Sequence, residues 1–305
     1  VDAFRCDMAE MVPVEFWQWA IGKVKEAHPD ILFIAEVYNP AQYRDYVHRG
    51  GFDYLYDKVG LYDALRAVTR HEASAQCLTR CWQQVDDIRT HMLHFLENHD
   101  EQRLASDFFA GDARRGRAPL LVSALMDYCP MMIYFGQELG ERGMDAEGYS
   151  GRDGRTTIYD YWTVDTVSRW RNGGKFNDKK LTGDEKRLRE FYARVLALRE
   201  SMPVLRSGHF YDLMYVNRHL HRQYVFVRQL EKQVLLVIAN FDDQEANLSI
   251  HLPEEFFRFI GQKGQTEVRA LDLLSEEETQ VDFTPDRPLC AKVLPWNGLM
   301  LSIDL

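Results

Sequence analysis

Apolar residues in the first part of the chain fall in short runs, and each run ends in an acidic group. The runs over 1–7, 31–36 and 91–100 are nearly continuous, which is typical of parallel strands buried on both faces. Between them, apolar residues recur at helical spacing over 13–28 and 75–85. Strands that alternate with helices in this way predict a parallel sheet of the (β/α) type.

The period of the pattern changes after Pro203, which stops a helix predicted from Asp184 to Met202. From there apolar and polar residues alternate, as they do in antiparallel strands with one buried face. Several such strands in succession predict an antiparallel β-sandwich. We therefore expect two domains, 1–203 and 204–305. The predicted strands of the second are 224–227, 234–241, 246–252, 268–273, 289–293 and 299–303.

Chemically active side chains stand at the ends of the three apolar runs. Arg5 and Asp7 end the first, Glu36 ends the second, and His99 and Asp100 end the third. Arg5 and Asp7 share one face of an extended strand, where a guanidinium keeps a carboxylate ionised, as a nucleophile must be. The carboxyl ends of parallel strands meet at one edge of a sheet, so these groups are expected to gather there. The alternative is a structural ion pair that closes a strand.

The segments that carry these groups are DAFRCD (2–7), IAEVYNP (34–40) and FLENHDEQR (95–103). In this order they resemble the second, third and fourth sequence motifs of the α-amylase family, glycoside hydrolase family 13. The resemblance implies that Asp7 is the nucleophile, that Glu36 is the general acid and base, and that Asp100 is the third catalytic acid. It implies no metal among the catalytic groups. The substrate-binding residues expected beside them are Arg5, His99, Tyr38 and Glu10.

The same resemblance implies a (β/α)8 barrel of the TIM type. The motifs correspond to the second part of that barrel, so only its fourth to eighth strands are expected in this chain. The family's first motif does not occur here, and Met8 and Ala9 stand where many relatives carry polar groups. A sheet left open at one edge exposes unpaired backbone groups and apolar side chains. We therefore expect the chain to be a piece of a longer protein, or a second chain to cover that edge.

The expected chemistry is hydrolysis with retention at a glycosidic bond. It needs a carboxylate nucleophile and a carboxylic acid, roughly 5–5.5 Å apart. The resemblance implies α-1,4-glucans, such as starch and maltooligosaccharides, as substrates. A glucanotransferase or an α-glucosidase remains an alternative, because a sugar hydroxyl and water attack the same intermediate. A non-catalytic half-barrel that binds glycans is a third interpretation.

The composition of the chain limits the classes of molecule that it is expected to bind. The formal net charge of −10, with no block of Lys and Arg, argues against nucleic acid and an anionic membrane surface, and favours a neutral oligosaccharide. The apolar stretch over 118–135 is broken by Asp127 and is not expected to span a membrane. No signal peptide heads the chain, and the compartment stays open among cytoplasmic, periplasmic and secreted.

The sequence contains two candidate metal sites. The five cysteines are expected to be free thiols, and Cys77 and Cys81, one helical turn apart, lack further ligands at metal spacing. A Ca²⁺ site at Asp145, Glu147 and Asp153 is the other candidate cofactor site, because oxygen ligands suit that ion.

Overall fold

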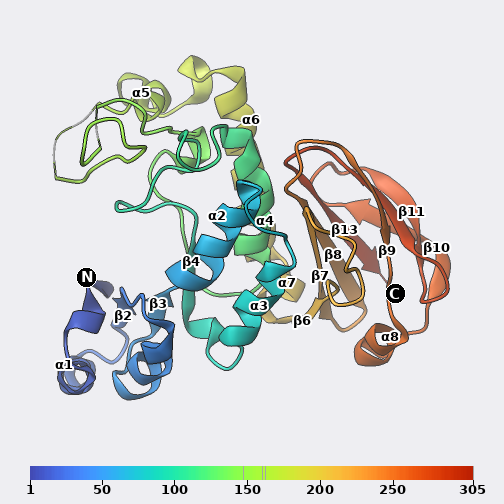
Figure 1. Cartoon of the computed structure of the whole chain (residues 1–305), viewed down its shortest axis with the longest axis horizontal. Coiled ribbons are helices and arrows are strands. Elements are labelled where there is room, and N and C mark those ends of the chain that lie inside the picture. The colour runs from blue at the N-terminus through green and yellow to red at the C-terminus, as the bar shows by residue number, and fades with distance from the viewer. Residues whose placement is uncertain (147, 160, 162, 305) are drawn as a thin grey trace.

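The computed structural model describes residues 1–146, 148–159, 161 and 163–304 (Figure 1). Its N-terminal half contains a five-stranded parallel sheet in the order β1-β2-β3-β4-β5. Each strand pairs with the next along the chain, so all the carboxyl ends lie at one edge. This is the parallel sheet that the sequence predicts. The strands are β1 (Ala3–Cys6), β2 (Leu32–Ala35), β3 (Tyr54–Tyr56), β4 (Met92–Phe95) and β5 (Met131–Met132).

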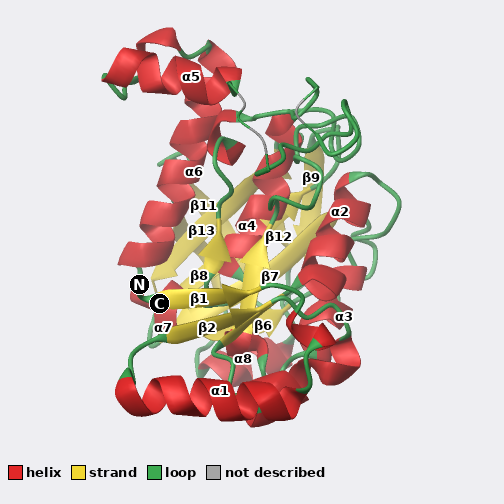
Figure 2. Ribbon diagram, turned by 90° about the vertical axis from the view of Figure 1, so that its left-hand side faces the viewer, coloured by secondary structure: helices red, strands yellow, loops and turns green. Residues whose placement is uncertain are grey.

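Helices cover this sheet. Figure 2 shows α1 running along one side of β1 and β2, and Ile21 of α1 shares a small apolar core with Phe33 and Phe52. The longest helix, α6, begins with a capping box between Thr182 and Glu185. The helices of this half are α1 (Val14–Ala27), α2 (Asp63–Thr69), α3 (Cys77–Gln84), α4 (Arg117–Leu125), α5 (Asp165–Arg171), α6 (Gly183–Ser201) and α7 (Pro203–Ser207).

Short helical turns lie between β2 and α2. Residues 40–49 form a 3-10 turn, Pro40–Gln42, and then a π-helical segment, Asp45–Arg49. A second π-helical segment, Lys58–Tyr62, leads into α2. The other 3-10 turns are Ala9–Met11, Arg89–His91, Ala113–Gly116, Gln137–Leu139, Asn172–Gly174 and Asp178–Lys180.

The C-terminal part consists of antiparallel sheets, as the sequence predicts. A six-stranded sheet has the order β11-β10-β13-β8-β7-β6, and β9 pairs with β12 in a second sheet. Apolar residues of both sheets share one core. The elements are β6 (His209–Asp212), β7 (Gln223–Leu230), β8 (Gln233–Asn240), β9 (Ala246–Ile250), α8 (Glu254–Ile260), β10 (Gln265–Asp272), β11 (Glu278–Phe283), β12 (Leu289–Val293) and β13 (Gly298–Asp304).

Helix α4 joins the two halves. It lies between them in Figure 1, and every residue from Ala118 to Leu125 is buried. A Cβ at Gly298 of β13 would stand 2.3 Å from Leu121 Cδ1, so only glycine permits this approach. The buried Arg228 of β7 donates to the carbonyls of Leu125 and Met126, 3.2 and 2.7 Å away. One apolar core therefore runs from the parallel sheet through α4 into the antiparallel sheet.

Large apolar side chains remain exposed beside the outer strands of the parallel sheet. They include Phe4 and Leu32 on β1 and β2, and Phe135 just after β5. Within the described residues, no helix combines the length and the apolar character needed to cross a membrane.

Candidate active site

The register of the sheet brings Asp7 and Glu36 together. Cys6 of β1 pairs with Ala35 of β2, and the amide of Glu36 donates to the Cys6 carbonyl at 3.1 Å. Asp7 and Glu36 each stand one residue beyond this pair, at the carboxyl edge of the sheet. The two acids that the sequence singled out are thus neighbours across two adjacent strands.

Arg5 bridges the two carboxylates. Its Nη1 contacts Asp7 Oδ1, and its Nη2 lies 3.1 Å from Glu36 Oε2. The Arg5 Nε donates to the Tyr56 hydroxyl at 3.4 Å, and the guanidinium lies 5.4 Å from that ring's centre. Since one planar group touches both acids, the contacted oxygens are at most roughly 8 Å apart. This upper bound is compatible with the separation of about 5–5.5 Å between the two carboxyl groups of a retaining glycosidase.

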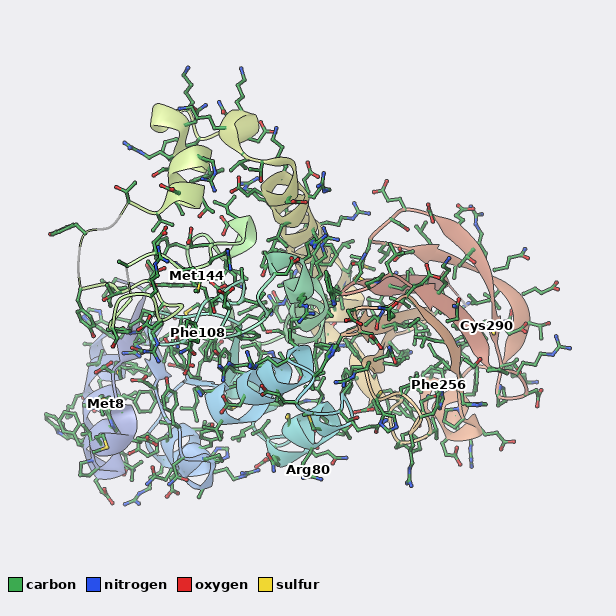
Figure 3. The ribbon with its side chains drawn as sticks, turned by 45° about the horizontal axis from the view of Figure 1, so that its top comes forward. Met8, Arg80, Phe108, Met144, Phe256 and Cys290 are labelled. Carbon is green, nitrogen blue, oxygen red and sulfur yellow. The ribbon has the colours of Figure 1, made fainter. Side chains whose placement is uncertain are left out.

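The two acids differ in exposure. The Asp7 side chain is 72% exposed and that of Glu36 only 8%. Glu36 Oε2 also accepts the amide of Met8 at 2.8 Å, and Met8 adopts a left-handed backbone with φ of 42°. Few non-glycine residues take that conformation, and it is often found at functional sites. Figure 3 shows Met8 on the half of the molecule away from Cys290 of the antiparallel sheets.

Tyr38 and Glu10 line the site next to Glu36. Burial raises the pKa of the Tyr38 phenol, and the charges of Glu36, Glu101 and Asp100 raise it further. Tyr38 therefore lies within electrostatic reach of acids from both β2 and β4. Glu10 Oε2 accepts the amide of Tyr38 at 3.0 Å and that of Asn39 at 2.9 Å. In this structure Glu10 holds the backbone after β2.

His99 and Asp100 follow β4 at the same edge of the sheet. His99 Nε2 lies 3.2 Å from Asp100 Oδ2. The Asn98 side chain accepts the amide of Asp100 at 2.9 Å, which fixes the turn. The hydroxyl of Tyr149 donates to the His99 carbonyl at 2.8 Å and lies 3.2 Å from Asp100 Oδ1. Sequence reasoning missed Tyr149, because no local pattern marks a loop tyrosine that reaches a distant strand end.

A buried ion pair supports this edge. Arg103 and Glu97 have side chains 0% and 1% exposed, and Arg103 Nη1 lies 2.9 Å from Glu97 Oε2. The same guanidinium donates to the Phe135 carbonyl at 2.8 Å and to Thr156 Oγ1 at 3.1 Å. Burial raises the pKa of Glu97, and the charge of Arg103 opposes this. Arg103 thus ties β4 to the segments that follow β5.

The proposed calcium ligands are only partly within the described residues, since Glu147 lies outside them. Asp153 accepts the amides of Ser150 and Arg155, at 3.2 and 3.1 Å, and so organises its own loop. Over the part of the chain that the structure describes, no three His, Cys, Asp or Glu side chains are grouped to hold a metal ion.

Cys77 and Cys81 are free thiols on α3. The Cys81 thiol contacts the carbonyls of Gly60 and Cys77. Burial, with the charge of Asp57 next, raises the pKa of Cys81 to about 12. This thiol is therefore protonated at neutral pH and is a poor metal ligand.

Residues 6–208 match the family model described as the alpha amylase catalytic domain. The chain belongs to the alpha-amylase family. This confirms the family expected from the three motifs. Two relatives are an Alpha-1,4-glucan:maltose-1-phosphate maltosyltransferase of Picrophilus torridus, 21% identical over 79% of this chain, and a Cyclomaltodextrinase of Bacillus sp, 24% identical over 79%. This chain spans only 34% and 39% of their respective lengths.

Solved structures of the family share the fold. An Anoxybacillus alpha-amylase superposes on all of this chain with a TM-score of 0.71 and 18% identity, and 59% of that protein is covered. AmyP, crystallised in complex with maltose, gives a TM-score of 0.71 and 16% identity, with 99% of this chain and 64% of AmyP covered. At such identities the likeness establishes the barrel-type fold with its antiparallel sheet domain.

Proposed function

We propose that this protein is a retaining glycoside hydrolase that acts on α-1,4-glucans such as starch and maltooligosaccharides. The observation that carries the proposal is the single guanidinium of Arg5, which bridges Asp7 and Glu36 at the carboxyl edge of the parallel sheet. The names of the two relatives, which refer to α-1,4-glucan and cyclomaltodextrin, support this class of substrate.

In the proposed mechanism Asp7 attacks the anomeric carbon of the sugar. The bond to the glycosidic oxygen breaks, and Glu36 transfers its proton to that oxygen, so the shortened glucan leaves. A water molecule then attacks the glycosyl ester on Asp7 and gives a proton back to Glu36, which restores both carboxyl groups. Arg5 contacts Asp7 and would orient it for the first step.

Asp100 and His99 would hold the hydroxyls of the sugar at the cleavage point, and Tyr38 and Glu10 would line the same subsite. Asp100 retains an exposed fraction of 40%, so a hydroxyl can reach it. Hydrogen bonds that strengthen as the ring distorts would favour the transition state over the bound ground state.

We assign β1 to β5 to the fourth to eighth strands of a (β/α)8 barrel. The exposed Phe4, Leu32 and Phe135 beside the outer strands would then be covered by the remaining strands or by a second chain, since sheet edges are normally paired or shielded.

A glucanotransferase, which passes the glycosyl group to a sugar acceptor, or an α-glucosidase of the same family is the second candidate, and transfer is the part that the relatives bear on. It is favoured by the maltosyltransferase among the relatives. A glycan-binding protein without catalysis is the third, and it leaves the bridged pair of acids without a role.

Incubation with maltoheptaose and chromatography of the products tests the proposal. Shorter maltooligosaccharides alone indicate hydrolysis, and longer ones formed together with them indicate transfer. Glu36→Gln removes the acid but keeps the shape, and should lower turnover by roughly 10²–10⁴-fold.

The matched control is Glu26→Gln on α1, an exposed acid paired only with Lys23, which should turn over normally. Equal turnover by the Glu36→Gln and unaltered proteins would refute the assigned role. If no product forms at any protein concentration, both hydrolysis and transfer are excluded.

A further inference from the structure

Among the described residues of the loop after β5, Tyr149 is the one whose side chain reaches Asp100, the acid that follows β4. Its hydroxyl lies 2.8 Å from the His99 carbonyl and 3.2 Å from Asp100 Oδ1. His99 Nε2 lies 3.2 Å from the other oxygen, Asp100 Oδ2. Both oxygens of Asp100 therefore have a polar neighbour, one from the adjacent residue and one from a distant loop.

Hydrogen bonds from backbone amides fix the turn that carries Tyr149. The amide of Gly148 donates to the Gly151 carbonyl at 3.0 Å, and the amide of Ser150 donates to Asp153 at 3.2 Å. The amide of Arg103 donates to the Gly154 carbonyl at 2.6 Å, which fastens this turn to the buried ion pair. Figure 3 places Met144, at the start of the loop, above Phe108 in the loop after β4.

The Tyr149 ring is held as well. The Arg155 guanidinium lies 5.5 Å from the ring centre, and the Tyr159 ring lies 5.9 Å away. Burial raises the pKa of Tyr149, and Asp100 raises it further. The phenol therefore keeps its proton at neutral pH and acts as a donor.

One hydroxyl proton serves two acceptors here. In the free protein it can point to Asp100 or to the His99 carbonyl, and the shorter contact is the one to the carbonyl. When a sugar hydroxyl donates to Asp100 Oδ1, the phenol can turn to the carbonyl without losing its own hydrogen bond. The phenol therefore keeps a hydrogen-bond acceptor before and after the exchange.

We propose that Tyr149 is a positioning residue that holds Asp100 in its sugar-binding rotamer and yields one carboxylate oxygen to an incoming sugar hydroxyl. This inference rests on the proposed function and extends the sugar site to the loop after β5. The ligand is a neutral glucose-type ring, because the exchange requires a hydroxyl that donates to a carboxylate.

The test is a double-mutant cycle in the complete protein, with Tyr149→Phe, Asp100→Ala and the double variant. Maltoheptaose binding is measured by calorimetry in the Glu36→Gln background, which prevents turnover. Without the phenol, Asp100 is no longer held in its sugar-binding rotamer in the free protein, and binding must include the cost of ordering it, so Tyr149→Phe should weaken binding by about three- to tenfold. In the Asp100→Ala background the same change should have less than a twofold effect.

Tyr128→Phe is the matched control, because it also removes a phenol hydroxyl beside a carboxylate, 3.4 Å from Glu200 and before β5. It should leave maltoheptaose binding unchanged. Steady-state kinetics with Glu36 intact should show the Tyr149→Phe loss in KM more than in kcat.

Three results would overturn the inference. The first is unaltered binding by Tyr149→Phe, and the second is an equal loss with and without Asp100, which would mark a purely structural role. In either case the unaltered protein still cleaves maltoheptaose, and only the role of Tyr149 is lost. The third is an unaltered protein that neither binds nor cleaves maltoheptaose, which removes the proposed function and this inference together.

Discussion

Replacing Arg103 by Met should strongly destabilise the protein. The Arg103 side chain is 0% exposed and lies 2.9 Å from Glu97 Oε2, so solvent does not screen the pair. Methionine fills much of the same volume but leaves the Glu97 charge buried without a counter-ion, although the Leu104 amide still donates to Oε1 at 2.7 Å. Breaking a buried pair on one side typically costs about 3–5 kcal/mol. The Phe135 carbonyl and Thr156 hydroxyl would lose their donor too.

The loss of stability in the Arg103→Met protein should depend on pH, and the protonation of Glu97 sets the direction of that dependence. Burial already raises the pKa of Glu97 above its ordinary 4.5 despite the opposing charge of Arg103. Without Arg103 this pKa rises further, so above pH 4.5 the folded state binds more protons than the unfolded state. Stability must then fall as the pH rises, by at most about 1.4 kcal/mol per pH unit, until Glu97 ionises in the folded state.

Urea unfolding followed by circular dichroism between pH 5 and pH 8 measures both effects. Arg142→Met is the control, because Arg142 pairs with Asp107 on the surface, where both side chains are more than half exposed. Its cost should stay below about 1 kcal/mol at every pH. A loss in Arg103→Met no larger than that of the control, or a loss independent of pH, would refute the reasoning.

Three further changes test other parts of the structure. Arg5→Met should lower kcat/KM for maltoheptaose by at least about tenfold, because the two acids lose their shared cation; unchanged kinetics would contradict the bridge. Gly298→Ala should lower the unfolding free energy by about 1–3 kcal/mol, since its Cβ would stand 2.3 Å from two atoms. Gly22→Ala, with nothing within 4 Å, is its control in the same denaturant assay. Burial lowers the pKa of the His94 imidazole, because it disfavours the charged form. Cys129 and other neighbours outweigh this effect and raise the pKa of His94 from 6.5 to about 10. The stability that protonated His94 contributes is complete below pH 6.5 and disappears as the pH rises towards 10. His94→Gln should therefore flatten the plot of unfolding free energy against pH between 6.5 and 10. An unchanged plot would argue against a charged His94.

The sequence predicted the elements whose signals are local. Buried parallel strands appear as continuous apolar runs, so β1, β2 and β4 were found, and with them the acids at their ends. Period-two alternation likewise revealed β7 and β8. The strands β6 and β11 were missed because they are at the edges of their sheet, where exposed polar residues hide the pattern.

Features that depend on tertiary contacts were not predictable. Helical periodicity near residue 61 does not show that the buried Asp57 carboxylate accepts the Leu61 amide at 2.8 Å, at the start of the π-helical turn. The sharing of Arg5 between two acids depends on the register of β1 against β2. Tyr149 reaches Asp100 only through the path of a long loop, which no spacing rule encodes.

The contact between Arg228 and the end of α4 has a consequence for how the molecule loses its structure. Arg228 supplies donors to carbonyls at the C-terminal end of α4, which have no partner within the helix. Detaching β7 would therefore fray α4 from that end and uncover its apolar surface. Heat should therefore unfold the C-terminal strands and the carboxyl edge of the parallel sheet in a single transition. A chain truncated after residue 203 should aggregate.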